Sequence, residues 1–193
     1  MSGSECCDAG GCGCQSGLDK ETLFAIAKDA SLHSTCVKTK TGALIVKDGI
    51  RISTGQNRCA PDGHNYGDTI EKCPREGMKT GTGYELCKPI HAEVMACLNA
   101  KSCPLTTDGM AKFAGHLAPS EEEIRAAFTP AELEWLLGAT LYLVGHYYAC
   151  ENCQRFCSIV GIKEILFDDV SGQATKDRYK ERGITNELPS GSD

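Results

Sequence analysis

Two short groups of candidate metal ligands constrain this chain more than any other feature of its sequence. The first is His91-Ala92-Glu93, and the second is the Cys-x-x-Cys pair Cys150 and Cys153. Each group stands where the sequence predicts the start of a helix. One imidazole and two thiolates form a zinc donor set that leaves the fourth tetrahedral position open for water. If both groups bind one ion, the fold has to bring two helix N-termini together.

The position of these groups at helix starts also favours reactivity. Free N–H groups and the helix dipole favour thiolate over thiol. Glu93 can stay outside the coordination shell and move protons, a function that a purely structural zinc site does not need. We therefore predict hydrolytic removal of an amino group from a heterocycle, with Glu93 as the catalytic residue and His91, Cys150 and Cys153 as zinc ligands. A zinc that only stabilises the domain is the alternative.

Strands and helices alternate along the rest of the chain. Apolar periodicity, turn signals and caps predict helices over about 20–31, 91–100, 150–160 and 174–182 and strands over 43–46, 50–54, 140–144 and 162–167. The first two strands are joined by the turn Lys47-Asp48-Gly49, so they should form a hairpin. This order predicts one α/β domain over 18–187, with helices packed on a single sheet.

Residues 101–138 interrupt this pattern and are predicted to be an insertion with helices of its own. Ser120 with Glu123 and Thr129 with Glu132 each fit a capping box. At the chain ends, residues 1–17 are rich in Gly, Ser and Cys, and we expect them to be disordered. Metal chelation by these cysteines is the alternative. Residues 188–193 are predicted to be a frayed tail.

The overall composition narrows the classes of partner. A net charge of −6 argues against broad capture of nucleic acid or anionic membranes, although a few local cations suffice for a small anionic ligand. No apolar run approaches the roughly 20 residues of a membrane-spanning helix, and the first residues do not read as a signal peptide. We therefore expect a cytoplasmic protein. Its 13 cysteines are then expected to be metal ligands and buried thiols rather than disulfides.

The two ligand groups together resemble the signature of zinc nucleobase deaminases. Within that superfamily the sequence is most similar to the deoxycytidylate (dCMP) deaminases of microbes and phages. The similar segments are Ser53-Thr54-Gly55-Gln56-Asn57, Cys73-Pro74-Arg75 and Gly83-Tyr84-Glu85-Leu86-Cys87, the last leading into His91. The resemblance implies a cytidine-deaminase-like three-layer α/β/α fold with a mixed sheet of about five strands.

The resemblance also implies a reaction and its partners. The reaction is the hydrolysis of dCMP to dUMP and ammonia, with one catalytic Zn²⁺ per chain. Family members form homo-oligomers, often hexamers, and some are controlled by dCTP and dTTP with Mg²⁺. The predicted substrate contacts are Asn57, Ala92, His146 and Tyr148. Asn57 could instead be a turn residue, and the aromatic run 146–148 could instead pack at a strand end.

The sequence departs from the family pattern beside the predicted base site. Ala149 stands where the family usually has proline, the link 145–149 is longer than usual, and the arginine often found before the strand 43–46 is absent, with Lys38 and Lys40 nearby. These departures favour, as the alternative, another amine substrate such as cytidine, dCTP, guanine or adenosine. A nucleic-acid-editing deaminase and a non-catalytic zinc module are the remaining alternatives.

Further cysteines could hold a second, structural zinc in the long loop before His91, as in some phage members of the family. The candidate ligands are Cys59, His64, Cys73 and Cys87, with Cys36 or Cys103 as additional candidates. Buried free cysteines are the alternative interpretation.

Overall fold

The computed structural model describes most of the chain between residues 18 and 170. The described residues are 18–60, 66, 68, 70–79, 82–83, 85–114, 117–170, 173–174, 177 and 181. The predicted disordered start (1–17), His64, the tail (188–193) and most of the predicted helix 174–182 lie outside them.

The helices and strands closely follow the sequence prediction. In chain order they are α1 (Lys20–Leu32), β1 (Gly42–Lys47), β2 (Ile50–Gln56), α2 (Ala92–Asn99), α3 (Thr107–Ala111), α4 (Glu121–Ala126), α5 (Pro130–Leu136), β3 (Thr140–Val144), α6 (Glu151–Ile159) and β4 (Glu164–Phe167). None of the helices in the part of the chain that the structure describes is long and apolar enough to cross a membrane.

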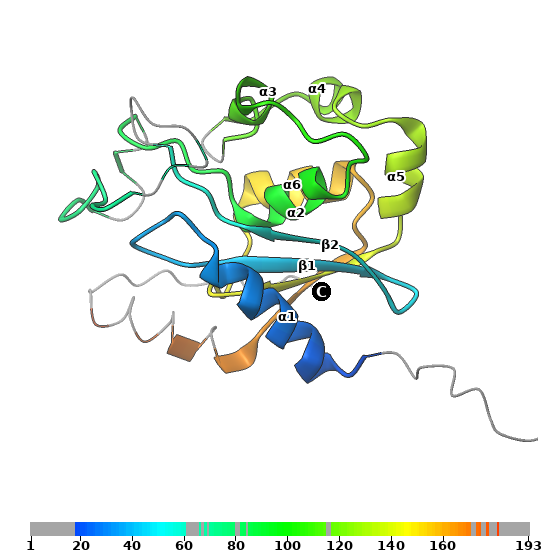
Figure 1. The fold of residues 1–193 in the computed structure, drawn as a ribbon, viewed down its shortest axis with the longest axis horizontal. Coiled ribbons are helices and arrows are strands. Elements are labelled where there is room, and N and C mark those ends of the chain that lie inside the picture. Colours follow the sequence, from blue (N-terminus) through cyan, green and yellow to red (C-terminus); the bar gives the residue numbers. More distant parts are fainter. Residues whose placement is uncertain are drawn as a thin grey trace, which may run out of the picture.

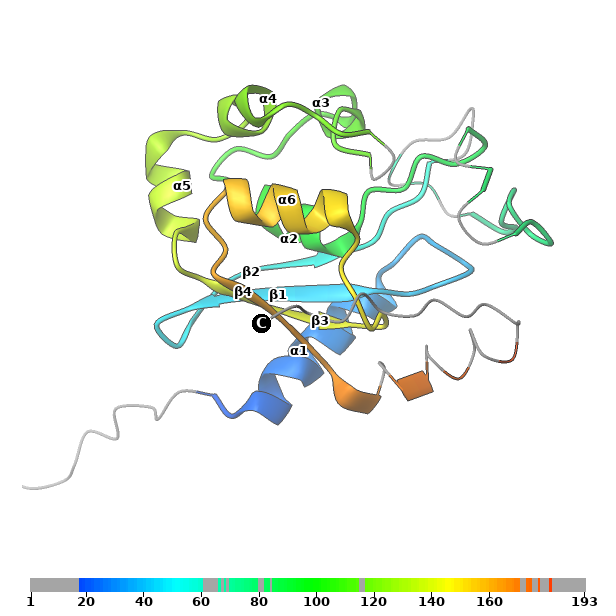
Figure 2. The same cartoon turned by 180° about the vertical axis from the view of Figure 1, so that it is seen from behind.

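The four described strands form one mixed sheet in the order β2-β1-β3-β4. β1 runs antiparallel to β2 and to β3, and β3 runs parallel to β4. Helix α1 covers one face of the sheet, whereas α2 and α6 cover the other (Figures 1 and 2). The predicted three-layer α/β/α architecture is therefore confirmed. The described sheet has four strands, close to the five that we expected.

The central strand β1 is apolar on both faces because a helix layer covers each of them. Leu44 and Val46 pack with residues of α1, and Ala43 and Ile45 pack with the layer of α2 and α6. The side chains of a strand alternate between the two faces of a sheet, so a strand covered on both sides is a continuous apolar run. This is why the sequence prediction found 43–46 as an uninterrupted apolar segment.

The same edge of the sheet collects the ends of three strands. Gly42, at the start of β1, pairs with Gln56 at the end of β2 and with Val144 at the end of β3. The residues that follow those two strands, Asn57 and Gly145, therefore leave the sheet at the same end, on either side of β1. This edge carries the candidate site described below.

The insertion packs over α2 and α6 as three short helices, α3 to α5 (Figure 2). Phe113 and Phe128 meet Phe156 of α6 edge to face, with ring centroids 5.6 and 6.3 Å apart. Ile124 of α4 is completely buried in the same core. Both predicted capping boxes are present at the starts of α4 and α5. The insertion thus extends the main core.

Candidate metal centre

The structure brings His91, Cys150 and Cys153 together, as the sequence predicted. Their ligand atoms all lie within 4.8 Å of one another. The His91 Nδ1 atom is 3.5 Å from the Cys150 sulfur and 3.3 Å from the Cys153 sulfur. Tetrahedral zinc with its usual Zn–N and Zn–S lengths separates such atoms by about 3.6 Å. The three side chains therefore fit a zinc ion with little adjustment.

The two helix starts place these ligands. His91 is the N-cap of α2 and Cys150 is the N-cap of α6, and both have extended backbone angles. Neither side chain makes a capping hydrogen bond to its own helix, so both are available to an ion. Cys153 lies three residues after Cys150, and residues at this spacing share one face of a helix. Cys150, Cys153 and His91 therefore meet between the N-termini of α2 and α6.

The local charges favour the ligand form of Cys150. Its hydrogen bond with Cys153 and the neighbouring His91 lower the pKa of this thiol to about 4, against the opposing effect of burial. Burial lowers the pKa of His91, but the hydrogen bond with Cys150 and the charge of Glu93 outweigh it, so this pKa is raised. A thiolate is the form of cysteine that binds zinc.

Glu93 lies in the first turn of α2 and is only 4% exposed. Burial is the largest cause that raises the pKa of its carboxyl group, and the charge of His91 opposes it. The neighbouring Cys153 side chain also acts to lower this pKa. The structure therefore places a buried acid with a raised pKa directly beside the three ligands. Such a group can accept a proton and return it.

Asn57 is held by the loop that connects α1 to β1. Its side-chain oxygen accepts hydrogen bonds from the Ser34 hydroxyl (2.6 Å) and the Thr41 N–H (2.9 Å), and its amide nitrogen donates to the Thr39 carbonyl (2.8 Å). Sequence reasoning missed this network, because nothing in the sequence shows that residues 34–41 pass beside the end of β2. The network fixes the orientation of Asn57.

The loop 145–149 is held against the same α1–β1 loop. Gly145 has a φ of +88°, and a Cβ atom there would lie 2.2 Å from the Lys40 carbonyl oxygen. His146 bonds through Nδ1 to the Tyr148 carbonyl (2.8 Å) and stacks on Tyr147, with ring centroids 5.7 Å apart. Burial is the main cause that lowers the pKa of His146, which the charge of His91 lowers further. The aromatic run thus packs on itself close to the metal ligands.

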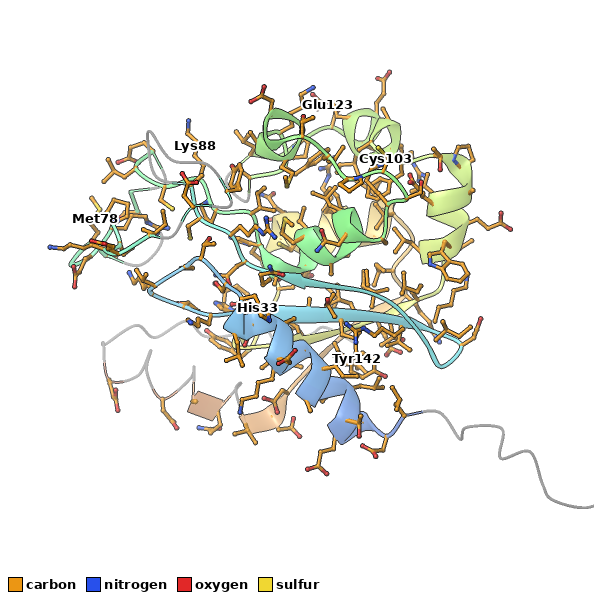
Figure 3. All side chains as sticks on the ribbon, in the orientation of Figure 1. His33, Met78, Lys88, Cys103, Glu123 and Tyr142 are labelled. Carbon is orange, nitrogen blue, oxygen red and sulfur yellow. The ribbon has the colours of Figure 1, made fainter. Side chains whose placement is uncertain are left out.

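Three further thiols meet near the site. The neighbouring side chains of Cys36 and Cys87 raise the pKa of the Cys59 thiol. Cys103, by contrast, is exposed in the insertion (Figure 3). Among the residues that the structure describes, His91, Cys150 and Cys153 are the one group of three with all ligand atoms close enough to share an ion. The predicted second zinc site therefore has only part of its ligand set in contact, and His64 lies outside the described residues.

Comparison with known proteins adds solved structures with low sequence identity. The dCMP deaminase of cyanophage S-TIM5 in complex with dCMP and dUMP is 21% identical, with a TM-score of 0.44 over 86% of this chain and 92% of that one. Its apo form is 20% identical, with a TM-score of 0.42 over 81% and 89%. No curated protein matches the sequence.

A third structure is the diaminohydroxyphosphoribosylaminopyrimidine deaminase/5-amino-6-(5-phosphoribosylamino)uracil reductase of Thermotoga maritima. It is 20% identical, with a TM-score of 0.36 over 85% of this chain and 34% of that one. Comparison with models of protein families identifies the family, because one model matches most of the described chain. The model of the cytidine and deoxycytidylate deaminase zinc-binding region matches residues 18–168, and the chain belongs to this family of deaminases.

Proposed function

We propose that this protein hydrolyses dCMP to dUMP and ammonia, with zinc held by His91, Cys150 and Cys153. The observation that carries the proposal is the buried carboxyl group of Glu93 beside three side chains whose spacing fits one zinc ion. Family membership supports a hydrolytic deaminase. The choice of dCMP within the family is supported by the sequence resemblance over Ser53–Asn57 and Gly83–Cys87.

The zinc site and Glu93 have separate functions in the proposed reaction. A zinc ion bound there would lower the pKa of its water to about 7, so that hydroxide is available near neutral pH. Glu93 takes a proton from the attacking water and gives it to the ring nitrogen of cytosine. It then takes the remaining proton of that water, now on the hydroxyl group of the attacked carbon, and passes it to the departing amino group. The C–N bond breaks as the carbonyl forms, so that one water is consumed and one ammonia is released. Positioned proton transfer of this kind contributes about 10²- to 10⁴-fold to the rate.

The substrate contacts follow from the edge of the sheet that carries the site. Asn57 has one amide hydrogen beyond the bond to Thr39, and we propose that it orients the nucleotide. Ala92 is fully buried in the first turn of α2, beside His91, and we propose that its backbone contacts the base. His146 and Tyr148 are half-buried in the loop that precedes Cys150, and we propose that their rings contact the base and the sugar.

Ammonia release from a panel of amines tests this proposal. The panel contains dCMP, dCTP, deoxycytidine, cytidine, cytosine, guanine and adenosine, each with the zinc-loaded protein. We expect the highest kcat/KM for dCMP. The departures at Ala149 and the loop 145–149 make another amine the second candidate, and a higher kcat/KM for a neutral compound would favour it. A Glu93→Gln variant is the control, because it should retain zinc and lose turnover of every compound.

We also propose the remaining family features as properties of this chain. They are a single deaminase domain over 18–187, a homo-oligomer, an effector site for a nucleotide with Mg²⁺, and a cytoplasmic location. Size-exclusion chromatography with light scattering measures the oligomer. Titration of dCTP or dTTP with Mg²⁺ into the dCMP assay tests the effector.

The second zinc remains a prediction that metal analysis can test. The contact of Cys59 with Cys36 and Cys87 supports it. The purified protein should contain two zinc ions per chain if this site binds metal and one if it does not. A Cys59→Ser variant should lose the second ion and keep the first.

A further inference from the structure

Arg58 carries a buried donor that has no partner. Its Nε atom is buried and makes no hydrogen bond. Among the residues that the structure describes, no carboxylate forms an ion pair with this guanidinium. Buried polar groups are almost always bonded, and an unmatched one calls for an explanation. A charged donor left without a partner is among the most costly cases.

The backbone of Arg58 is fixed beside the candidate metal centre. Its N–H donates to the Ile90 carbonyl (2.9 Å), and its carbonyl accepts from the Ile90 N–H (2.8 Å). Ile90 directly precedes His91, and Asn57 directly precedes Arg58. The guanidinium is therefore attached one residue from the proposed substrate contact and opposite the residue before a metal ligand. Hydrogen bonds hold both neighbours of this guanidinium in place. The backbone of Arg58 is bonded to Ile90, and the side chain of Asn57 is bonded to Ser34, Thr39 and Thr41.

An anionic ligand can supply a partner for the buried Nε donor of Arg58. Phosphate suits a guanidinium because two parallel N–H donors can bond two of its oxygens. A protein with a net charge of −6 does not attract a nucleotide by its overall field, so local donors at the site have to bind the phosphate. We propose that Arg58 binds the 5′-phosphate of the substrate nucleotide and so selects nucleotides over neutral nucleosides. This inference rests on the proposed function, because it assumes a nucleotide substrate.

The test compares one charged and one neutral substrate. Arg58→Gln and wild type are assayed with dCMP and with deoxycytidine, which lacks only the phosphate. A lost hydrogen bond to a charged group corresponds to about a 10- to 100-fold change. We expect kcat/KM for dCMP to fall by that factor in Arg58→Gln, chiefly through KM, with little change for deoxycytidine. Lys88→Gln is the matched control, because Lys88 is an exposed cation on the segment that leads to His91 (Figure 3).

The outcomes separate this inference from the proposed function. Equal losses on both substrates, or no loss on dCMP, would overturn the function of Arg58. If wild type releases ammonia from another amine and none from dCMP, the proposed function fails, and calorimetric titration with inorganic phosphate then decides on Arg58. Loss of phosphate binding in Arg58→Gln alone supports the inference, and unchanged binding overturns it. Arg58→Gln should also melt no lower than wild type, whereas loss of a structural arginine lowers the melting temperature.

Discussion

Glu132 ties helix α5 to the first residues of the insertion, Lys101 and Ser102, and its replacement by glutamine gives the most quantitative prediction. The carboxylate accepts hydrogen bonds from the N–H and hydroxyl of Ser102 (both 2.8 Å), from the Thr129 N–H (2.8 Å) and from Lys101 Nζ (3.1 Å). The Lys101 amine also donates to the Ala127 carbonyl. Burial acts to raise the pKa of Glu132, but these bonds outweigh it and hold the pKa at about 2.

The magnitude follows from this pKa. The ordinary value is 4.5, and each unit of difference corresponds to about 1.4 kcal/mol, so the ionised carboxylate stabilises the fold by about 3 kcal/mol at neutral pH. Removal of one partner from a buried ion pair typically costs about 3–5 kcal/mol, which agrees. Because the pKa is lower in the folded state, the stabilisation is complete above pH about 5 and disappears as the pH falls towards 2.

Urea denaturation of wild type and Glu132→Gln at pH 7, 5 and 3 measures this difference. We expect a lower free energy of unfolding for the variant, by about 3 kcal/mol at pH 7 and by about half of that at pH 3. Glu121→Gln is the control, since its ion pair with Arg125 is more than half exposed and should contribute less than about 1 kcal/mol. A Glu132→Gln loss below about 1 kcal/mol at pH 7, or one that does not change with pH, would refute this reasoning.

Three further predictions concern the metal centre and the helix that carries it. Glu93→Gln should keep its zinc and its fold but lower kcat by about 10²- to 10⁴-fold, measured by ammonia release and metal analysis; full activity would exclude Glu93 as the proton carrier. In Gly55→Ala, the new Cβ would lie 2.2 Å from the Ala96 backbone nitrogen, so α2 has to move and stability should fall by about 1–3 kcal/mol in urea denaturation. Gly109→Ala, in the exposed helix α3, should show no such loss. Chelation of zinc should lower the melting temperature of wild type, because the ion binds the folded state, but not that of Cys153→Ala. Equal chelator effects on the two proteins would contradict this site.

The local elements could be predicted from the sequence because their signals are local. The apolar run at 43–46 and the turn after it predict the hairpin of β1 and β2, and both strands formed there. The boxes that begin at Ser120 and Thr129 predict the starts of α4 and α5, and both are present. Capping and turn formation involve residues only a few positions apart, so a single sequence contains all the necessary information.

The path of the insertion could not be predicted in the same way. The sequence indicated helices within 101–138 but not the surface that they cover. Phe113, Phe128 and Ile124 meet the core of α2 and α6 through contacts between distant residues. Burial of Glu132 with Lys101 is likewise a tertiary event, because an isolated capping box leaves its glutamate in water. Apolar periodicity identifies a face to bury but does not identify its partner.

The sequence alone identified the two groups of metal ligands. The chemistry of His91 with Glu93, and of Cys150 with Cys153, follows from residue type and local spacing. The helices that begin at His91 and Cys150 fix that spacing. The tertiary structure decided what surrounds them. It joined Asn57 to residues 34–41, set the loop 145–149 against Lys40, and placed Arg58 opposite Ile90 with a buried, unpartnered donor. These relations depend on strand register and on the packing of segments far apart in the chain, because no local interaction specifies which distant backbone or side chain will be the neighbour.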